Sequence, residues 1–117
     1  SYYYAHLRKG SPYAEGIEAG SQVKAGQVIG YMGMTGYSTK SNVNGMSVPH
    51  LHLGLQLVFD ESQKEGDNQI WLDVYNLMKL LGRNRATVVK NDLTGHYTRK
   101  YDIISNNYPD TLKKYFD

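Results

Sequence analysis

Two histidines separated by one residue, His50 and His52, are the side chains of this sequence best suited to chemistry. They lie among alternating leucines typical of a β-strand, so both imidazoles are expected on the same face of a sheet, about 6–7 Å apart. Neutral imidazole is a common zinc ligand. The spacing suits one metal ligand beside a second group just outside the metal shell. The simpler interpretation, two polar residues on a solvated strand face, is the more common one for a bare His-x-His pair.

The surroundings of this pair favour a functional site. A long polar loop over residues 35–49 precedes it, and a loop of this length in a small domain is usually functional or mobile. Gly54 follows it and lets another group approach the backbone closely. Tyr37 and Ser38 begin the loop and are candidates to line a peptide-binding groove, although loop polarity alone also explains them.

Short strands between turns must position these residues. Residues 1–7 are aromatic and predict a strand, and residues 29–34 predict a second one after a tight turn. Residues 50–59 predict the strand that carries the histidines, with its leucines facing a core. The turn within residues 22–33 resembles a β-hairpin of the barrel–sandwich hybrid type. It also resembles lipoyl and biotinyl carrier hairpins, but it lacks their lysine at the tip.

One helix is expected after these strands. Apolar residues with helical spacing predict it over residues 71–81, and Gly82 stands where a glycine would end it. The expected fold is therefore mostly β: a small antiparallel sheet or sandwich with an open groove and one short helix toward the C-terminus.

Composition narrows the function classes. A chain of 117 residues suits one small domain, and the absence of cysteine excludes disulfides and cysteine-bound metals. The formal net charge of +2 is too weak to indicate nucleic-acid binding. No apolar run approaches the roughly 18 residues of a membrane span.

Three segments in order carry a family resemblance: residues 4–7 (YAHL), residues 20–38, and residues 49–55 (PHLHLGL). Together they resemble the lysostaphin-type zinc metalloendopeptidases, which hydrolyse peptidoglycan of bacterial cell walls. The resemblance implies that residues 1–85 are the C-terminal portion of such a peptidase domain. Residues 86–117 would then be an extension of the same domain, without an assigned role.

The resemblance also implies roles for the histidines. In this family two histidines and one aspartate hold a zinc ion, which polarises the scissile carbonyl and activates a water. The second histidine of His-x-His is one ligand, which is His52 here. His50 and His6 correspond to the catalytic histidines: His50 as general base or proton shuttle, and His6 as the group that stabilises the oxyanion or orients the water.

The sequence departs from the family at the other two ligands. The family takes them from a His-x-x-x-Asp motif upstream of the His6 segment, and no such motif occurs here. Catalytic zinc sites use about three protein ligands, so the chain alone is expected to be inactive. A separate N-terminal fragment of the same protein is the expected partner. Three explanations for the missing motif stay open. The protein is nicked into two chains, its upstream part is absent from this sequence for another reason, or it is a degenerate relative without catalytic activity.

The resemblance thus implies an extracellular or cell-envelope bacterial enzyme that uses Zn²⁺ and acts on peptidoglycan peptides. The competing class is a non-catalytic peptidase-like domain that binds a wall polymer or a partner protein. A complete His-x-x-x-Asp motif upstream would favour the enzyme, and its absence would favour the binding module.

Overall fold

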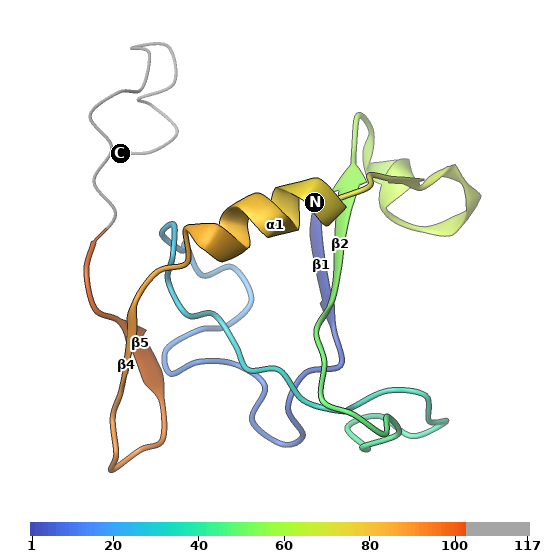
Figure 1. The fold of residues 1–117 in the computed structure, drawn as a ribbon. Coiled ribbons are helices and arrows are strands. Elements are labelled where there is room, and N and C mark those ends of the chain that lie inside the picture. Colours follow the sequence, from blue (N-terminus) through green and yellow to red (C-terminus); the bar gives the residue numbers. More distant parts are fainter. Residues whose placement is uncertain (103–117) are drawn as a thin grey trace, which may run out of the picture.

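The computed structural model describes residues 1–102, which form two small antiparallel sheets and one α-helix (Figure 1). The first sheet has the strand order β1 (Tyr2–Ala5), β2 (His52–Leu57) and β3 (Ile70–Trp71). The second sheet is the hairpin of β4 (Val88–Lys90) and β5 (Tyr97–Arg99). The expected fold class, mostly β and antiparallel with one short helix, is confirmed.

The remaining elements link these sheets. Two 3-10 turns, η1 (Glu61–Lys64) and η2 (Gly66–Asn68), connect β2 to β3, and helix α1 (Tyr75–Arg83) connects the first sheet to the hairpin (Figure 1). None of the helices within residues 1–102 has the length and apolar character needed to cross a membrane.

The register between β1 and β2 decides which side chains share a face. Tyr3 lies opposite Gly54, and Ala5 lies opposite His52. Residues directly opposite each other in an antiparallel pair project from the same face. Tyr3 therefore shares the face of His52, whereas Tyr2 and Tyr4 share the face of the β2 leucines.

The leucine face of β2 is expected from the sequence to be buried, and within residues 1–102 it is only partly so. Leu53 and Leu55 are half-buried, whereas Leu51 and Leu57 are 42% and 38% exposed. Within residues 1–102 the buried residues are Ala14 and Gln56, at 7% and 6% exposure. Helix α1 contains no buried residue, so it does not form a closed layer over the leucines.

The helix also begins and ends later than expected. Trp71 belongs to β3, where it pairs with Gln56, so the helix does not start there. The Asp73 carboxylate instead accepts from the Tyr75 amide at 2.9 Å, which satisfies a free donor at the helix start. Gly82 lies inside α1. Asn84 ends the helix, because its side chain donates to the Leu80 carbonyl at 2.9 Å.

The strand expected over residues 29–34 is replaced by isolated bridges. Within this segment Gly30 pairs with Tyr13, Met32 with Leu7, and Gly33 with His50. Each bridge has a different partner segment, so no two consecutive pairs form a continuous ladder.

The hairpin of β4 and β5 contacts the first half of the chain through Tyr31. The Tyr31 hydroxyl accepts from the Tyr97 amide at 2.9 Å and hydrogen-bonds with His96 Nδ1 at 3.1 Å. The Arg8 guanidinium lies 4.1 Å from the centroid of the Tyr31 ring. The hairpin falls within the segment 86–117 that is expected to extend the peptidase domain, and residues 103–117 of that segment lie outside the described residues.

Candidate active site

Three histidines that are far apart in the sequence meet at one end of β2. The ring centroid of His6 lies 4.8 Å from that of His50 and 5.7 Å from that of His52. The structure thus brings together the three histidines singled out from the sequence, which we call the histidine cluster. The fourth histidine, His96, lies in the β4–β5 hairpin against Tyr31.

His6 reaches this cluster through an unusual backbone conformation. Regular alternation along β1 would give His6 the face of Tyr4, opposite to that of His52. His6 has a φ of 60°, in the left-handed region that non-glycine residues rarely adopt. This residue ends β1 and turns the imidazole back toward His52. Strained residues of this kind concentrate at functional sites.

Backbone carbonyls fix the tautomers of two of the histidines. His6 Nδ1 donates to the Thr35 carbonyl at 2.6 Å, and His50 Nδ1 donates to the Val48 carbonyl at 2.9 Å. A carbonyl oxygen only accepts, so Nδ1 carries the proton in each ring. Nε2 of His6 and of His50 is thus left as an acceptor in the neutral ring, which is the form that a general base requires.

Glycines let the chain approach the histidine cluster. The Gly33 amide donates to the His6 carbonyl at 2.8 Å, and its carbonyl accepts from the His50 amide at 3.2 Å. A Cβ at Gly33 would lie 2.5 Å from Arg8 Cα, and one at Gly36 would lie 2.8 Å from His6 Nδ1. Side chains at these two positions would therefore disturb the anchoring of the cluster.

The two loop residues proposed to contact substrate differ in their surroundings. The Tyr37 ring stacks on His6 with a centroid distance of 6.0 Å and is 85% exposed, so it stands at the edge of the cluster. The Ser38 hydroxyl accepts from the Lys40 amide at 3.1 Å and belongs to the turn of the loop. The geometry thus brings Tyr37, but not Ser38, to the histidine cluster.

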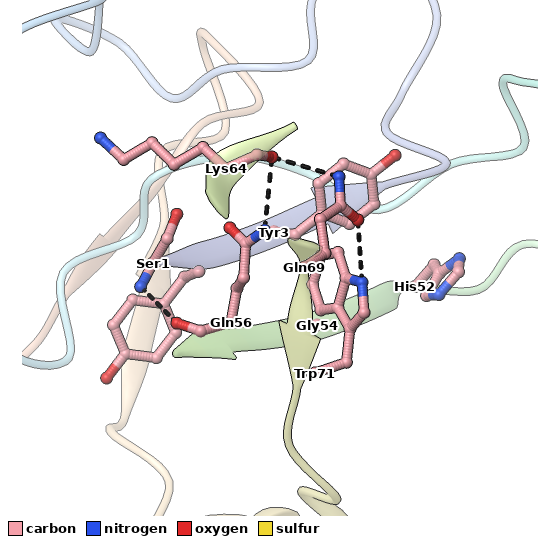
Figure 2. A pocket seen from close by; sticks show the side chains of 9 residues that line it. Ser1, Tyr3, His52, Gly54, Gln56, Lys64, Gln69 and Trp71 are labelled. Carbon is pink, nitrogen blue, oxygen red and sulfur yellow. Dashed lines mark hydrogen bonds between the residues drawn. The ribbon is translucent and has the colours of Figure 1, made fainter. Parts of the chain in front are cut away.

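An open groove of about 610 Å³ adjoins the cluster, and His52 stands at one end of it (Figure 2). The groove runs along β2, between the rings of Tyr3 and Trp71 and the turns that follow β2. Sequence reasoning missed Tyr3 and Trp71 as groove residues, since aromatic residues beside a strand are most often packing residues. The sequence feature that could have indicated this role is Gly54, because a residue without a side chain leaves room for aromatic rings above the strand.

The histidine cluster fits zinc in the chemistry of its donors but not in their number. Imidazole nitrogens are common zinc ligands, and ligating histidines usually donate their other N–H to a carbonyl or carboxylate. Within residues 1–102, however, no three histidine, aspartate or glutamate side chains are arranged to hold one metal ion. The described residues therefore do not complete a zinc site by themselves.

Comparison with known proteins finds relatives that are named as endopeptidases or lysostaphin. Curated relatives include the glycyl-glycine endopeptidase ALE-1 of Staphylococcus capitis, 31% identical over 87% of this chain and 23% of that protein. Lysostaphin of Staphylococcus simulans is 35% identical over 87% of this chain and 17% of its own length. The L-Ala–D-Glu endopeptidase of Bacillus subtilis is 43% identical over 46% of this chain and 15% of its own length.

The chain spans about a quarter or less of the length of these relatives. No solved structure matches it. The profile of Peptidase family M23 matches residues 1–68, which include the whole histidine cluster. Because this match covers more than half of the 117 residues, the chain belongs to Peptidase family M23.

Proposed function

We propose that this chain is part of a zinc-dependent endopeptidase that hydrolyses peptide bonds in bacterial peptidoglycan, at the cell envelope or outside the cell. The observation that carries the proposal is the meeting of His6, His50 and His52 at the end of an open groove, in a chain of Peptidase family M23. Relatives named as glycyl-glycine and L-Ala–D-Glu endopeptidases support it, since both kinds of bond occur in peptidoglycan.

The histidine cluster supplies the proton-handling groups in this proposal. His50 Nε2 accepts the proton of the attacking water, because its Nδ1 proton is held by the Val48 carbonyl. His6 orients the water or stabilises the developing oxyanion. Tyr37, stacked on His6, contacts the substrate peptide at the edge of the cluster, and Ser38 takes part in the same loop.

In this proposal His52 would supply one of the zinc ligands. The remaining histidine and aspartate ligands would come from a segment upstream of residue 1 in the same protein, either continuous with this chain or a separate fragment. Residues 1–102 do not complete the ligand set of the metal.

Among the described residues β1 is an edge strand, and its outer edge offers a place for that upstream segment. Ser1 and Gln56 exchange hydrogen bonds of 2.8 Å in both directions. Since hydrogen-bonded pairs alternate along an antiparallel ladder, the backbone groups of Tyr2 and Tyr4 point away from β2. Their side chains are 68% and 40% exposed. A strand added at this edge would pair those groups and lie next to the histidine cluster.

The test is digestion of purified peptidoglycan by the protein expressed together with its encoded upstream sequence, with mass spectrometry of the released peptides. We expect new amino termini at one kind of peptide bond. His50→Ala should remove them, and His96→Ala should not, since His96 lies outside the cluster. A protein with a complete His-x-x-x-Asp motif that binds peptidoglycan without cleaving it would contradict the proposal and favour a binding module.

A further inference from the structure

Two aromatic rings form an apolar wall in the groove that leads away from His52 (Figure 2). Trp71 lies directly over the backbone of Gly54, where an added Cβ would be 2.5 Å from the indole Cζ3. Tyr3 stands edge-on to both neighbours, with centroid distances of 5.9 Å to Trp71 and 6.0 Å to His52. Apolar parts of a bound peptide would therefore contact Tyr3 and Trp71.

The far end of the groove is built by side-chain amides. Gln56, only 6% exposed, donates to the carbonyls of Gln63 at 2.8 Å and Lys64 at 3.3 Å. Gln69 donates to the same Lys64 carbonyl at 3.2 Å and accepts from the Trp71 indole at 3.0 Å. These hydrogen bonds hold the turns η1 and η2 against β2, and so they fix the position from which the Lys64 side chain extends.

Lys64 brings a positive charge to this end of the groove. Its ammonium pairs with the Glu61 carboxylate at 2.7 Å, and the two side chains are 46% and 84% exposed. Exposed ion pairs contribute little because water screens them, so a ligand carboxylate can displace Glu61. In Figure 2 the Lys64 ammonium and the His52 ring lie at opposite ends of the groove.

We propose that this groove binds the part of the substrate peptide that carries a free carboxylate, and that Lys64 recognises this group. His52 and Gln56 are four positions apart on β2, which corresponds to about 13 Å along a strand. An extended peptide would thus carry its carboxylate about four residues from the cleaved bond. A peptide whose D-Glu unit lies at that distance from the cleaved bond meets this requirement, whereas an internal polyglycine segment carries no carboxylate and does not. The proposal rests on the proposed function and adds its substrate class.

Trp71 is the sole tryptophan in the 117 residues, so its fluorescence reports directly on the groove. The chain would be titrated with a C-terminally amidated tetrapeptide containing L-Ala–D-Glu, with the same peptide amidated also at the free D-Glu carboxylate, and with pentaglycine amide. We expect the acidic peptide to change the Trp71 emission and to bind about three- to fivefold more tightly than the fully amidated one. Pentaglycine amide should bind more weakly than both.

Variants assign the preference to Lys64. Lys64→Gln should remove the difference between the acidic and amidated peptides, and Lys64→Arg should keep it. Glu61→Gln should tighten binding of the acidic peptide, because it frees the ammonium. Lys24→Gln is the matched control, since Lys24 lies in an exposed turn outside the groove and its loss changes the net charge equally.

Equal affinity for the acidic and amidated peptides would overturn this proposal, as would a preference that persists in Lys64→Gln. Absence of any emission change with all three peptides would also overturn it, because the groove would then not be a peptide site. Digestion of whole peptidoglycan tests the proposed function separately. If the protein cleaves peptidoglycan but binds the two tetrapeptides equally well, the proposed substrate class is wrong and the proposed endopeptidase function is still supported.

Discussion

The imidazole of His6 lies 5.7 Å from that of His52, although regular alternation along β1 would place the two side chains on opposite faces of the sheet. The φ of 60° at His6 produces this arrangement. A non-glycine residue in that region costs about 1–3 kcal/mol. Hydrogen bonds from Gly33 to the His6 carbonyl and from His6 to the Thr35 carbonyl hold the strained conformation in place.

Gly33→Ala should disrupt the histidine cluster. The new Cβ would lie 2.5 Å from Arg8 Cα and 2.6 Å from the Leu7 carbonyl oxygen. Backbone atoms cannot move aside cheaply, so we expect the free energy of unfolding to fall by about 1–3 kcal/mol. Denaturant unfolding measures this change, and NMR shifts of the His6 and His50 rings report the displacement of the cluster.

Gly82→Ala is the matched control for that substitution. Gly82 lies inside α1, and a Cβ there would meet no atom within 4 Å. Alanine favours a helix more than glycine does, so we expect stabilisation of about 0.5–1 kcal/mol. Equal losses of stability in the two variants would contradict the assignment of a steric role to Gly33.

Tyr31→Phe should loosen the β4–β5 hairpin from the first half of the chain. The hydroxyl accepts from the Tyr97 amide and hydrogen-bonds with His96, and its loss leaves both groups without this partner. We expect destabilisation by about 0.5–1.5 kcal/mol, because water can reach the exposed Tyr97 amide, and faster hydrogen exchange of that amide. Tyr13→Phe serves as the control, because Tyr13 is 57% exposed. Unchanged exchange at Tyr97 in Tyr31→Phe would contradict this contact.

Asp60 should respond to acid at the turn that positions Lys64. Its carboxylate accepts from the Ser62 hydroxyl at 2.6 Å and from the Ser62 amide at 2.9 Å. These hydrogen bonds, the hydroxyl first, hold the pKa of Asp60 below its ordinary value of 3.8. A lowered pKa in the folded state means that the stabilisation is fully present above pH 3.8 and is lost as the pH falls through the lowered value.

The carboxyl carbon shift of Asp60, followed by NMR, measures this titration. We expect its midpoint below pH 3.8 in the native chain and a higher midpoint in Ser62→Ala, which removes the hydroxyl donor. A midpoint that does not move in Ser62→Ala would contradict the role of that hydrogen bond.

The sequence predicted the parts of the site that follow strand alternation. The local period and composition predict strands over residues 50–59 and 1–7. The structure has the shorter strands β2, which begins at His52, and β1, over Tyr2–Ala5, and His50 lies just before β2 in an isolated bridge to Gly33. The approach of His6 to this pair followed from the family resemblance and not from alternation, which predicts the wrong face. The left-handed backbone conformation at His6 explains how this residue can follow β1 and still place its ring beside His52.

Other features depended on contacts between distant residues. Trp71 was expected in a helix, but pairing with Gln56 places it in β3, and its indole lies over Gly54. Gly82 was expected to end the helix, but the Asn84 side chain does so instead. Such tertiary contacts override local propensity. They also create the groove, whose far wall at Lys64 carries no signal in a single sequence.

The 117-residue chain by itself should bind zinc weakly. Within the described residues no three side chains are arranged around one metal ion, and catalytic zinc sites need about three protein ligands. Calorimetric titration with zinc should therefore show no stoichiometric binding with sub-micromolar affinity. Tight binding by this chain alone would mean that it supplies a complete ligand set, contrary to the expected upstream ligands.

The division of labour between His50 and His52 is the central claim, and zinc content measured beside peptidoglycan cleavage tests it most directly. In the protein with its upstream segment, His52→Ala should lose zinc and turnover together. His50→Ala should keep zinc and lose turnover by about 10²–10⁴-fold, the effect of removing a proton-transfer group. His96→Ala should keep both. Zinc lost in His50→Ala but retained in His52→Ala would contradict the account.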